Sequence, residues 1–277
     1  MPELPEVESF KYILAHHALH KKIKKVAIKD TRLIKGISAS SFEKNLVGHN
    51  FASVDRIGKM LVVTIKDSDV TLIMHFGLTG FLVFSKTEQE KVKFSQVDFL
   101  FADSSVLHWL TVRKFAKLWL LKKSNALKHI AQVGVDALNI TKKLLELLVE
   151  KYPRKNVKAF LMDQSLIAGI GNEYSDEILF QAGIDPHLVL KALSRAQITK
   201  MYTQIKKVLK YAIAVRIDGI KKHTRYGSSA DFHQMFKKSY LQSHRHIDMI
   251  CPKNKNHTLK KATIAGRTSY YCPHDQK

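Results

Sequence analysis

The chain has 277 residues, enough for two domains of ordinary size, and its 45% apolar content is normal for a globular protein. No apolar run reaches the length of a membrane span and no signal peptide is recognisable, so we expect no membrane partner. Lys and Arg total 46 against 24 acidic residues, and this net charge of +22 indicates a polyanionic partner, nucleic acid before membrane. Two cysteines, Cys251 and Cys272, are too few for a disulfide framework and favour a reducing cytoplasm.

The hydrophobic pattern changes twice along the chain. Helical spacing of apolar residues predicts a helix over residues 3 to about 20. From about 24 to 122, short Val, Ile, Phe and Leu runs separated by polar clusters predict many strands, as in a β-sandwich or barrel. After about 124 the period is helical again, and a polar, basic, turn-rich segment follows from about 226 to the end.

This pattern predicts an α+β protein with a C-terminal appendage. We expect an N-terminal domain of one helix and many strands over residues 2–125, a helical domain over 126–230 and the appendage over 231–277. Within the helical domain, Ser194 to Gln197 has the pattern of a capping box. An apolar stripe behind it predicts a core-facing helix, formed by Ile198, Met201, Ile205, Val208, Ala212 and Val215.

The first six residues carry a candidate nucleophile. Removal of Met1, expected when the second residue is small, leaves Pro2 with a free secondary amine, and α-amino groups in general titrate at roughly pH 8. Such an amine can attack an electrophilic sugar carbon and collapse to an iminium without a lysine. Glu3 and Glu6 place carboxylates within reach for proton transfer. The alternative is an ordinary initiator methionine followed by a polar helix cap, because Pro5 and Glu6 also suit a helix N-terminus.

A second informative stretch runs from residue 161 to 177. Gly169 and Gly171 precede Asn172 and a helical run, so a tight turn leads into a helix N-terminus that can hold a phosphate. The sequence carries no signal of a long strand in front of these glycines, which argues against a dinucleotide-binding fingerprint.

Both stretches closely resemble the formamidopyrimidine-DNA glycosylase / endonuclease VIII family of DNA repair enzymes. The resemblance covers nearly the whole chain and implies a β-sandwich in the N-terminal domain, a helix–two-turn–helix element in the helical domain and a C-terminal β-hairpin zinc finger over 231–277. It is weakest from about 217 to 250, where formamidopyrimidine-type members have a loop that closes over the damaged purine. Further matching segments are Arg56–Lys59, His75–Gly80, Arg113–Phe115 and Gly266–Thr268.

The resemblance implies a role for each matching residue. Pro2 is the nucleophile, Glu3 transfers protons, Glu6 supports the terminus, and Lys59 assists catalysis while contacting phosphate. The other phosphate contacts are His75, Asn172 and Arg267. An enzyme that acts on a base must flip it out of the stack. The side chains that fill the vacated space are Leu78, which stands where the family usually has methionine, Arg113 and Phe115.

The finger departs from the family pattern, which has two Cys-x2-Cys pairs about sixteen residues apart. Here the second cysteine of each pair is replaced, by Asn254 and by Asp275. Cys251 and Cys272, together with His257, His274 or Asp275, could form an irregular metal site, but two thiolates bind zinc more weakly than four. We expect, by a small margin, a hairpin without structural zinc. The segment from Cys251 to Lys277 has six basic residues and one acidic residue, which suits DNA in either case.

The resemblance therefore implies a base-excision-repair DNA glycosylase and abasic-site lyase that acts through a Schiff base on Pro2, followed by β,δ-elimination. Its expected substrates are oxidised purines, 8-oxoguanine and formamidopyrimidines, in double-stranded DNA, and abasic sites. No metal or nucleotide cofactor is needed for the chemistry, and we expect a cytoplasmic, nucleoid-associated monomer. The alternatives are an endonuclease VIII-like preference for oxidised pyrimidines, an inactive damaged-DNA-binding protein of the same fold and, more weakly, an RNA-binding protein.

Overall fold

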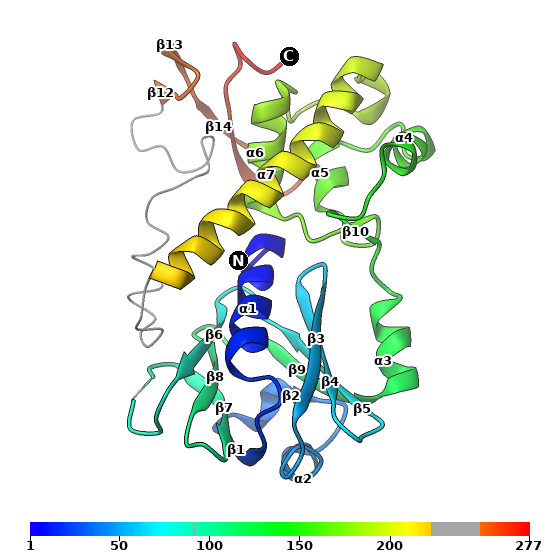
Figure 1. The fold of residues 1–277 in the computed structure, drawn as a ribbon. Coiled ribbons are helices and arrows are strands. Elements are labelled where there is room, and N and C mark those ends of the chain that lie inside the picture. The colour runs from blue at the N-terminus through cyan, green and yellow to red at the C-terminus, as the bar shows by residue number, and fades with distance from the viewer. Residues whose placement is uncertain (91, 223–249) are drawn as a thin grey trace. The chain divides into compact units, whose positions relative to one another are not determined.

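The computed structural model describes residues 1–90, 92–222 and 250–277, which divide into two compact units (Figure 1). Of these residues, unit 1 comprises 1–90, 92–132 and 213–222, and unit 2 comprises 133–212 and 250–277. The division at 125/126 stays a prediction. The boundary at 230/231 and most of the unmatched loop region lie outside the described residues.

Unit 1 begins with helix α1, Leu4–His17, as the sequence predicts. Pro5 lies in its first turn, where a missing N–H costs nothing, and Glu6 stands at the positive end of the helix dipole. The buried face of α1 includes Val7 and Phe10. The ring of Phe10 packs against Phe76, with ring centroids 4.6 Å apart, so α1 rests on the turn that follows strand β5.

The described part of unit 1 has nine strands in two sheets, which confirms the predicted β-sandwich (Figure 1). The five-stranded sheet has the order β2 (Ile34–Lys35), β9 (Lys117–Lys122), β5 (Val70–His75), β4 (Met60–Ile65) and β3 (Phe51–Ile57). The four-stranded sheet has the order β1 (Ile23–Ile28), β7 (Ser95–Phe101), β8 (Val106–Thr111) and β6 (Gly80–Ser85). The short helical elements are η1 (Thr31–Leu33), α2 (Ala39–Lys44) and α3 (Lys123–Ile130).

The sandwich core contains side chains from both sheets and from α1. Strand β8 is buried along its whole length, and β4 and β5 carry mostly buried apolar side chains. Burial of this kind contributes about 25 cal/mol per Å² of apolar surface, so the sandwich is a rigid support for its connecting turns. Three of these turns carry predicted site residues: the β3–β4 turn, the β5–β6 turn and the segment between β8 and β9.

Unit 2 combines helices with short strands. Its elements are β10 (Val135–Asp136), α4 (Lys142–Lys151), α5 (Val157–Met162), β11 (Ile167–Ala168), α6 (Asn172–Ala182), η2 (Leu190–Ala192) and the first part of α7 (Arg195–Lys222). The capping box at the start of α7 is confirmed: Ser194 N–H donates to Gln197 Oε1 at 2.9 Å, and Gln197 N–H donates to Ser194 Oγ at 3.2 Å. Met201, Ile205 and Ala212 of the predicted stripe are buried.

Two β-hairpins complete unit 2, as predicted for the C-terminal element. They pair β12 (Ile250–Cys251) with β13 (Asn254–Thr258), and β14 (Lys260–Ile264) with β15 (Arg267–Tyr271). The turn of the second hairpin consists of Ala265 and Gly266, both with positive φ, as a type I′ turn requires. Arg267 is therefore the first residue after a tight hairpin turn. None of the helices described here is both long and apolar enough to span a bilayer.

Candidate active site and nucleic-acid interface

The N-terminus is folded into unit 1. Pro2 is buried, Glu3 is 1% exposed and Glu6 is 8% exposed. Glu3 and Glu6 form a capping box, in which Glu6 Oε2 accepts the backbone N–H of Glu3 at 2.7 Å. That N–H belongs to the peptide bond that follows Pro2. Glu6 therefore holds the backbone next to the proposed nucleophile, while the side chain of Glu3 lies within the same first turn.

Arg216 is a site residue that sequence reasoning missed. It lies on α7, is 8% exposed, and forms an ion pair with Glu6 through Nη2 and Oε1. Glu6 thus links a backbone N–H of the N-terminus to a buried guanidinium. One signal could have revealed it: Arg216 is four residues from both Ala212 and Ile220, which are buried, so it interrupts the apolar stripe with a charge that needs a partner.

Lys59 lies in the two-residue turn between β3 and β4, where Ile57 pairs with Met60. Gly58 has a φ of 55°, in the region that favours glycine. Arg56 donates to the carbonyl of Gly58 at 3.1 Å and forms an ion pair with Glu8 of α1. The turn that carries Lys59 is thereby tied to the helix that follows Pro2.

His75 ends strand β5, opposite Met60 and next to the Lys59 turn. Burial, with smaller contributions from the charges of Lys59, Lys117 and His129, lowers the pKa of His75 from 6.5 to about 4. The ring is therefore neutral at pH 7. Because its Nδ1 lies 3.2 Å from the N–H of Gly77 and accepts it, its proton is on Nε2. A neutral Nε2–H donor suits a phosphate oxygen.

Leu78, Arg113 and Phe115 lie on two loops in direct contact. The backbone N–H of Arg113 donates to Thr79 Oγ1 at 2.9 Å. Gly77 has a φ of +56°, and a Cβ there would lie 2.6 Å from the carbonyl carbon of Phe115, so only glycine lets the two loops approach so closely.

Apolar side chains on these two loops face solvent. Leu78 is 37% exposed and Phe115 is 58% exposed. Lys114, between Arg113 and Phe115, has a φ of 56° and pairs with Asp30 at 3.0 Å. An exposed leucine and an exposed phenylalanine beside an exposed arginine form a surface suited to inserting into a base stack.

Asn172 and Arg267 belong to unit 2. Asn172 begins α6, and its Nδ2 donates to the carbonyl of Thr268 at 3.0 Å. The turn in front of it is held by Gln164, whose side chain accepts the Gly169 N–H at 3.0 Å and donates to the Ile170 carbonyl at 2.7 Å. The structure therefore brings Asn172 directly beside the residue that follows Arg267.

A buried ion pair fastens β15 to the helices. Lys158 Nζ lies 2.6 Å from Asp176 Oδ1, and both side chains are fully buried. The same carboxylate accepts the Ser269 hydroxyl and the Tyr270 N–H, the latter at 3.3 Å. Because the pair anchors the strand that begins at Arg267, Lys158 and Asp176 are positioning residues that sequence reasoning missed.

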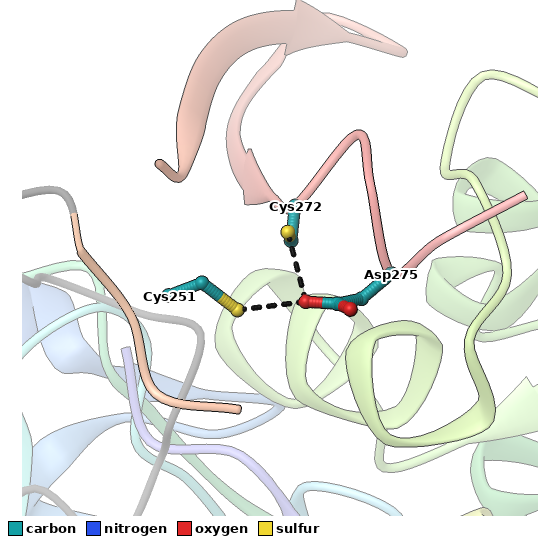
Figure 2. Close-up of side chains that lie close together, drawn as sticks. All are labelled: Cys251, Cys272 and Asp275. Atoms are coloured by element: carbon teal, nitrogen blue, oxygen red, sulfur yellow. Dashed lines mark hydrogen bonds between the residues drawn. The ribbon is translucent and has the colours of Figure 1, made fainter. Parts of the chain in front are cut away.

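Three of the predicted metal ligands lie together. The reactive atoms of Cys251, Cys272 and Asp275 are all within 4.8 Å of one another (Figure 2). His257 lies beside them, with Nδ1 3.1 Å from Asp275 Oδ2 and 3.9 Å from Cys272 Sγ. His274 instead stacks on the ring of His257, with centroids 4.6 Å apart. The donor set contains thiol, imidazole and carboxylate groups, which are the groups that zinc binds.

Comparisons with known proteins identify the class. Residues 1–118 match the model of the formamidopyrimidine-DNA glycosylase N-terminal domain, and residues 134–224 match that of the formamidopyrimidine-DNA glycosylase H2TH domain. These two domains define a class of two-domain DNA glycosylases.

Whole-chain relatives agree with the domain models. The chain is 33% identical to the formamidopyrimidine-DNA glycosylase of Desulfitobacterium hafniense, over 99% of this chain and 98% of the relative. It is similar to two structures of Lactococcus lactis Fpg, each with a TM-score of 0.86. One, a complex with abasic site containing DNA, is 26% identical and covers 99% of both chains; the other, with N7-benzyl-Fapy-dG containing DNA, is 27% identical and covers 100% of both. The chain belongs to the formamidopyrimidine-DNA glycosylase family.

Proposed function

We propose that this protein is a base-excision-repair glycosylase that removes oxidised purines, 8-oxoguanine and formamidopyrimidines, from double-stranded DNA and then cleaves the abasic site. The observation that carries the proposal is the buried Pro2–Glu3 terminus, held by Glu6, in a chain similar along its whole length to formamidopyrimidine-DNA glycosylases. A helix cap alone does not require that a second carboxylate bind a buried arginine from a distant helix.

The proposed chemistry begins with Pro2 after removal of Met1. Its amine nitrogen bonds to C1′ of the damaged nucleotide while the glycosidic bond breaks and the base leaves with a proton. Glu3 protonates the ring oxygen, the C1′–O4′ bond opens, and the nitrogen lone pair forms the iminium. Loss of the C2′ proton expels the 3′ phosphate, and a second elimination expels the 5′ phosphate. Glu6 and Arg216 keep the terminus in place during these steps.

DNA binding uses the remaining residues. Lys59 and the Nε2–H of His75 contact phosphates from unit 1, and Asn172 and Arg267 do so from unit 2. Leu78, Arg113 and Phe115 fill the space left by the extruded nucleotide, at an unstacking cost of a few kcal/mol. Their exposure and the contact between their two loops support this assignment.

The cellular setting of the reaction is also a proposal. The amine and carboxylates supply the nucleophile and the proton transfers, so the reaction needs neither a metal nor a nucleotide cofactor. We place the protein in the cytoplasm at the nucleoid, acting as a monomer, in line with its charge of +22.

Borohydride trapping tests the proposal. Duplexes containing 8-oxoguanine, an oxidised pyrimidine or an abasic site are incubated with the protein and borohydride, and the covalent adduct is mapped. We expect an adduct at Pro2, formed faster with 8-oxoguanine than with the pyrimidine. Pro2→Gly, and a form extended before Pro2, should trap more slowly by a large factor while still binding the duplex. No adduct on any duplex would rule out the enzyme, and faster reaction with the pyrimidine would assign the endonuclease VIII-like preference.

A further inference from the structure

Three donors converge on one carboxylate oxygen in the C-terminal hairpin region. The thiols of Cys251 and Cys272 each donate to Asp275 Oδ2 at 3.0 Å, and His257 Nδ1 lies 3.1 Å from the same oxygen. Both cysteines are buried, 1% and 0% exposed. Figure 2 shows the two cysteines reaching Asp275 from separate segments of the chain. A carboxylate needs no such set of weak thiol donors to be satisfied, so the cluster calls for another explanation.

Cys251 Sγ, Cys272 Sγ and a carboxylate oxygen of Asp275 lie within 4.8 Å of one another, and His257 Nδ1 lies beside this group, close to Asp275 and Cys272. With Zn–S of about 2.3 Å and Zn–N or Zn–O of about 2.0 Å, neighbouring ligand atoms lie about 3.3 to 3.8 Å apart. Here the sulfur–oxygen distances are 3.0 Å, the nitrogen–oxygen distance is 3.1 Å, and Cys272 Sγ lies 3.9 Å from His257 Nδ1. These separations are within about 0.3 Å of those in a tetrahedral zinc shell, so modest shifts of the side chains would arrange them around an ion.

The residues around the cluster hold its ligands in place. His257 Nε2 lies 3.3 Å from the amide of Asn254, so the Nδ1 edge of the ring faces the cluster. Lys253 Nζ donates to the carbonyl of Phe180 at 2.6 Å and lies 4.3 Å from that ring's centroid. Phe180 packs in the same buried cluster as the two cysteines. An ammonium group near two thiolates and a carboxylate offsets the single negative charge that these ligands leave on a divalent ion.

We propose that Cys251, Cys272, His257 and Asp275 bind one Zn²⁺, in place of the four cysteines of the family finger. Asp275 stands at the position of the fourth cysteine, and His257, three residues beyond Asn254, supplies the ligand that Asn254 does not. Binding replaces the two thiol protons, which are released to solvent, and joins the first hairpin to the segment that follows β15. The sequence favours a metal-free hairpin by a small margin; the geometry points to the opposite conclusion.

Cobalt substitution tests the site without any measurement of glycosylase activity. The full chain is treated with a chelator under reducing conditions and titrated with Co²⁺. We expect the intense visible absorption of tetrahedral cobalt and a thiolate-to-cobalt charge-transfer band, saturating at one equivalent and displaced by one equivalent of Zn²⁺. The midpoint temperature of thermal unfolding should rise when Zn²⁺ is added, because an ion that binds only the native state stabilises it.

Single substitutions assign the ligands. Loss of a direct ligand should weaken cobalt binding by more than about 100-fold, because loss of a residue that only hydrogen-bonds to a ligand already costs up to about that much. We expect this for Cys272→Ser, Asp275→Ala and His257→Ala. His274→Ala is the matched control, since that ring stacks on His257 and lies outside the ligand set, and it should bind like the unmodified chain. Asp275→Cys should retain binding and strengthen the charge-transfer band. Circular dichroism of each variant separates loss of a ligand from loss of the fold.

Three results would overturn the proposal: no cobalt spectrum in the reduced chain, a spectrum unchanged by His257→Ala and Asp275→Ala, or a Cys251–Cys272 disulfide in the isolated protein together with no cobalt uptake after reduction. The proposal does not depend on the enzymatic function. Borohydride trapping reports on Pro2 in unit 1, so either proposal can fail while the other stands.

Discussion

The N-terminus of unit 1 and the C-terminal hairpins of unit 2 build their sites in different ways. Pro2, Glu3 and Glu6 lie within five residues, and an ordinary helix cap gives them their geometry. In the hairpin cluster, Cys251 and His257 lie on the first hairpin and Cys272 follows the second, so the packing of the two hairpins brings them to Asp275. A nucleophile and its proton donor cannot be exchanged for other groups without loss of the reaction, whereas a metal site accepts thiolate, imidazole and carboxylate donors in several combinations.

The largest expected effect is at the locally built site. Glu3→Gln should lower the rate of adduct formation by about 100- to 10,000-fold, because it removes a positioned proton donor. Single-turnover trapping measures the rate, and duplex binding should stay within a factor of a few. Glu150→Gln, on α4, is the control and should have no effect. An unchanged rate for Glu3→Gln would remove Glu3 from the chemistry.

The next largest effect is expected for the buried ion pair that anchors strand β15. Lys158→Met leaves the fully buried carboxylate of Asp176 without its cation and should lower the free energy of unfolding by about 3–5 kcal/mol. Urea denaturation measures it. The double variant Lys158→Met/Asp176→Leu removes both charges and should recover part of the loss. If the single variant is as stable as the unmodified chain, the pair does not anchor the strand.

Arg216 links the N-terminus to a distant helix, so it tests whether the first site is only local. Arg216→Met should slow adduct formation by up to about 100-fold through misplacement of the terminus, with little change in duplex affinity. Arg216→Lys should restore part of the rate, since it keeps the charge next to Glu6. Lys222→Met, exposed on the same helix, serves as the control. A loss confined to duplex affinity would contradict a positioning role.

His75 should make the stability of unit 1 depend on pH. Because its pKa falls from 6.5 in the unfolded chain to about 4 in the folded one, the unfolded chain binds more protons between these values. The folded state is therefore favoured above pH 6.5, and this contribution is lost as the pH falls towards 4. Denaturation of His75→Gln between pH 7 and 4 should show a shallower decline than the unmodified chain. Parallel curves would show that His75 is not the group responsible.

The smallest effect is expected at the wedge. Leu78→Met conserves volume on a half-exposed loop and should change the trapping rate by less than about tenfold, within the 1.5 kcal/mol typical of such exchanges. Leu78→Ala should slow the rate more, because the side chain then no longer fills the stack. The two variants should be equally stable, since Leu78 is outside the core. Equal rates for the two would argue that the wedge plays no part in base extrusion.

The sequence alone determined the features that depend on neighbouring residues. The helix over the first twenty residues, the strand-rich region, the capping box at Ser194 and the turn before Asn172 were all predicted, because caps, alternation and glycine turns are local properties. The motif residues could be named for the same reason. Their spatial grouping could not, as the contact between the loops of Leu78 and Phe115 shows.

Only the tertiary structure decided which distant residues meet. Arg216 reaches Glu6 from 210 positions away, Lys158 meets Asp176 inside unit 2, and His257 rather than His274 faces the cysteines. A sequence records which groups are available, but burial makes a charge or a thiol depend on whatever partner packing places beside it. For this chain the first six residues therefore suggest a nucleophile at Pro2, whereas the ion pair that supports this terminus and the grouping of His257 with the cysteines and Asp275 are decided by the fold.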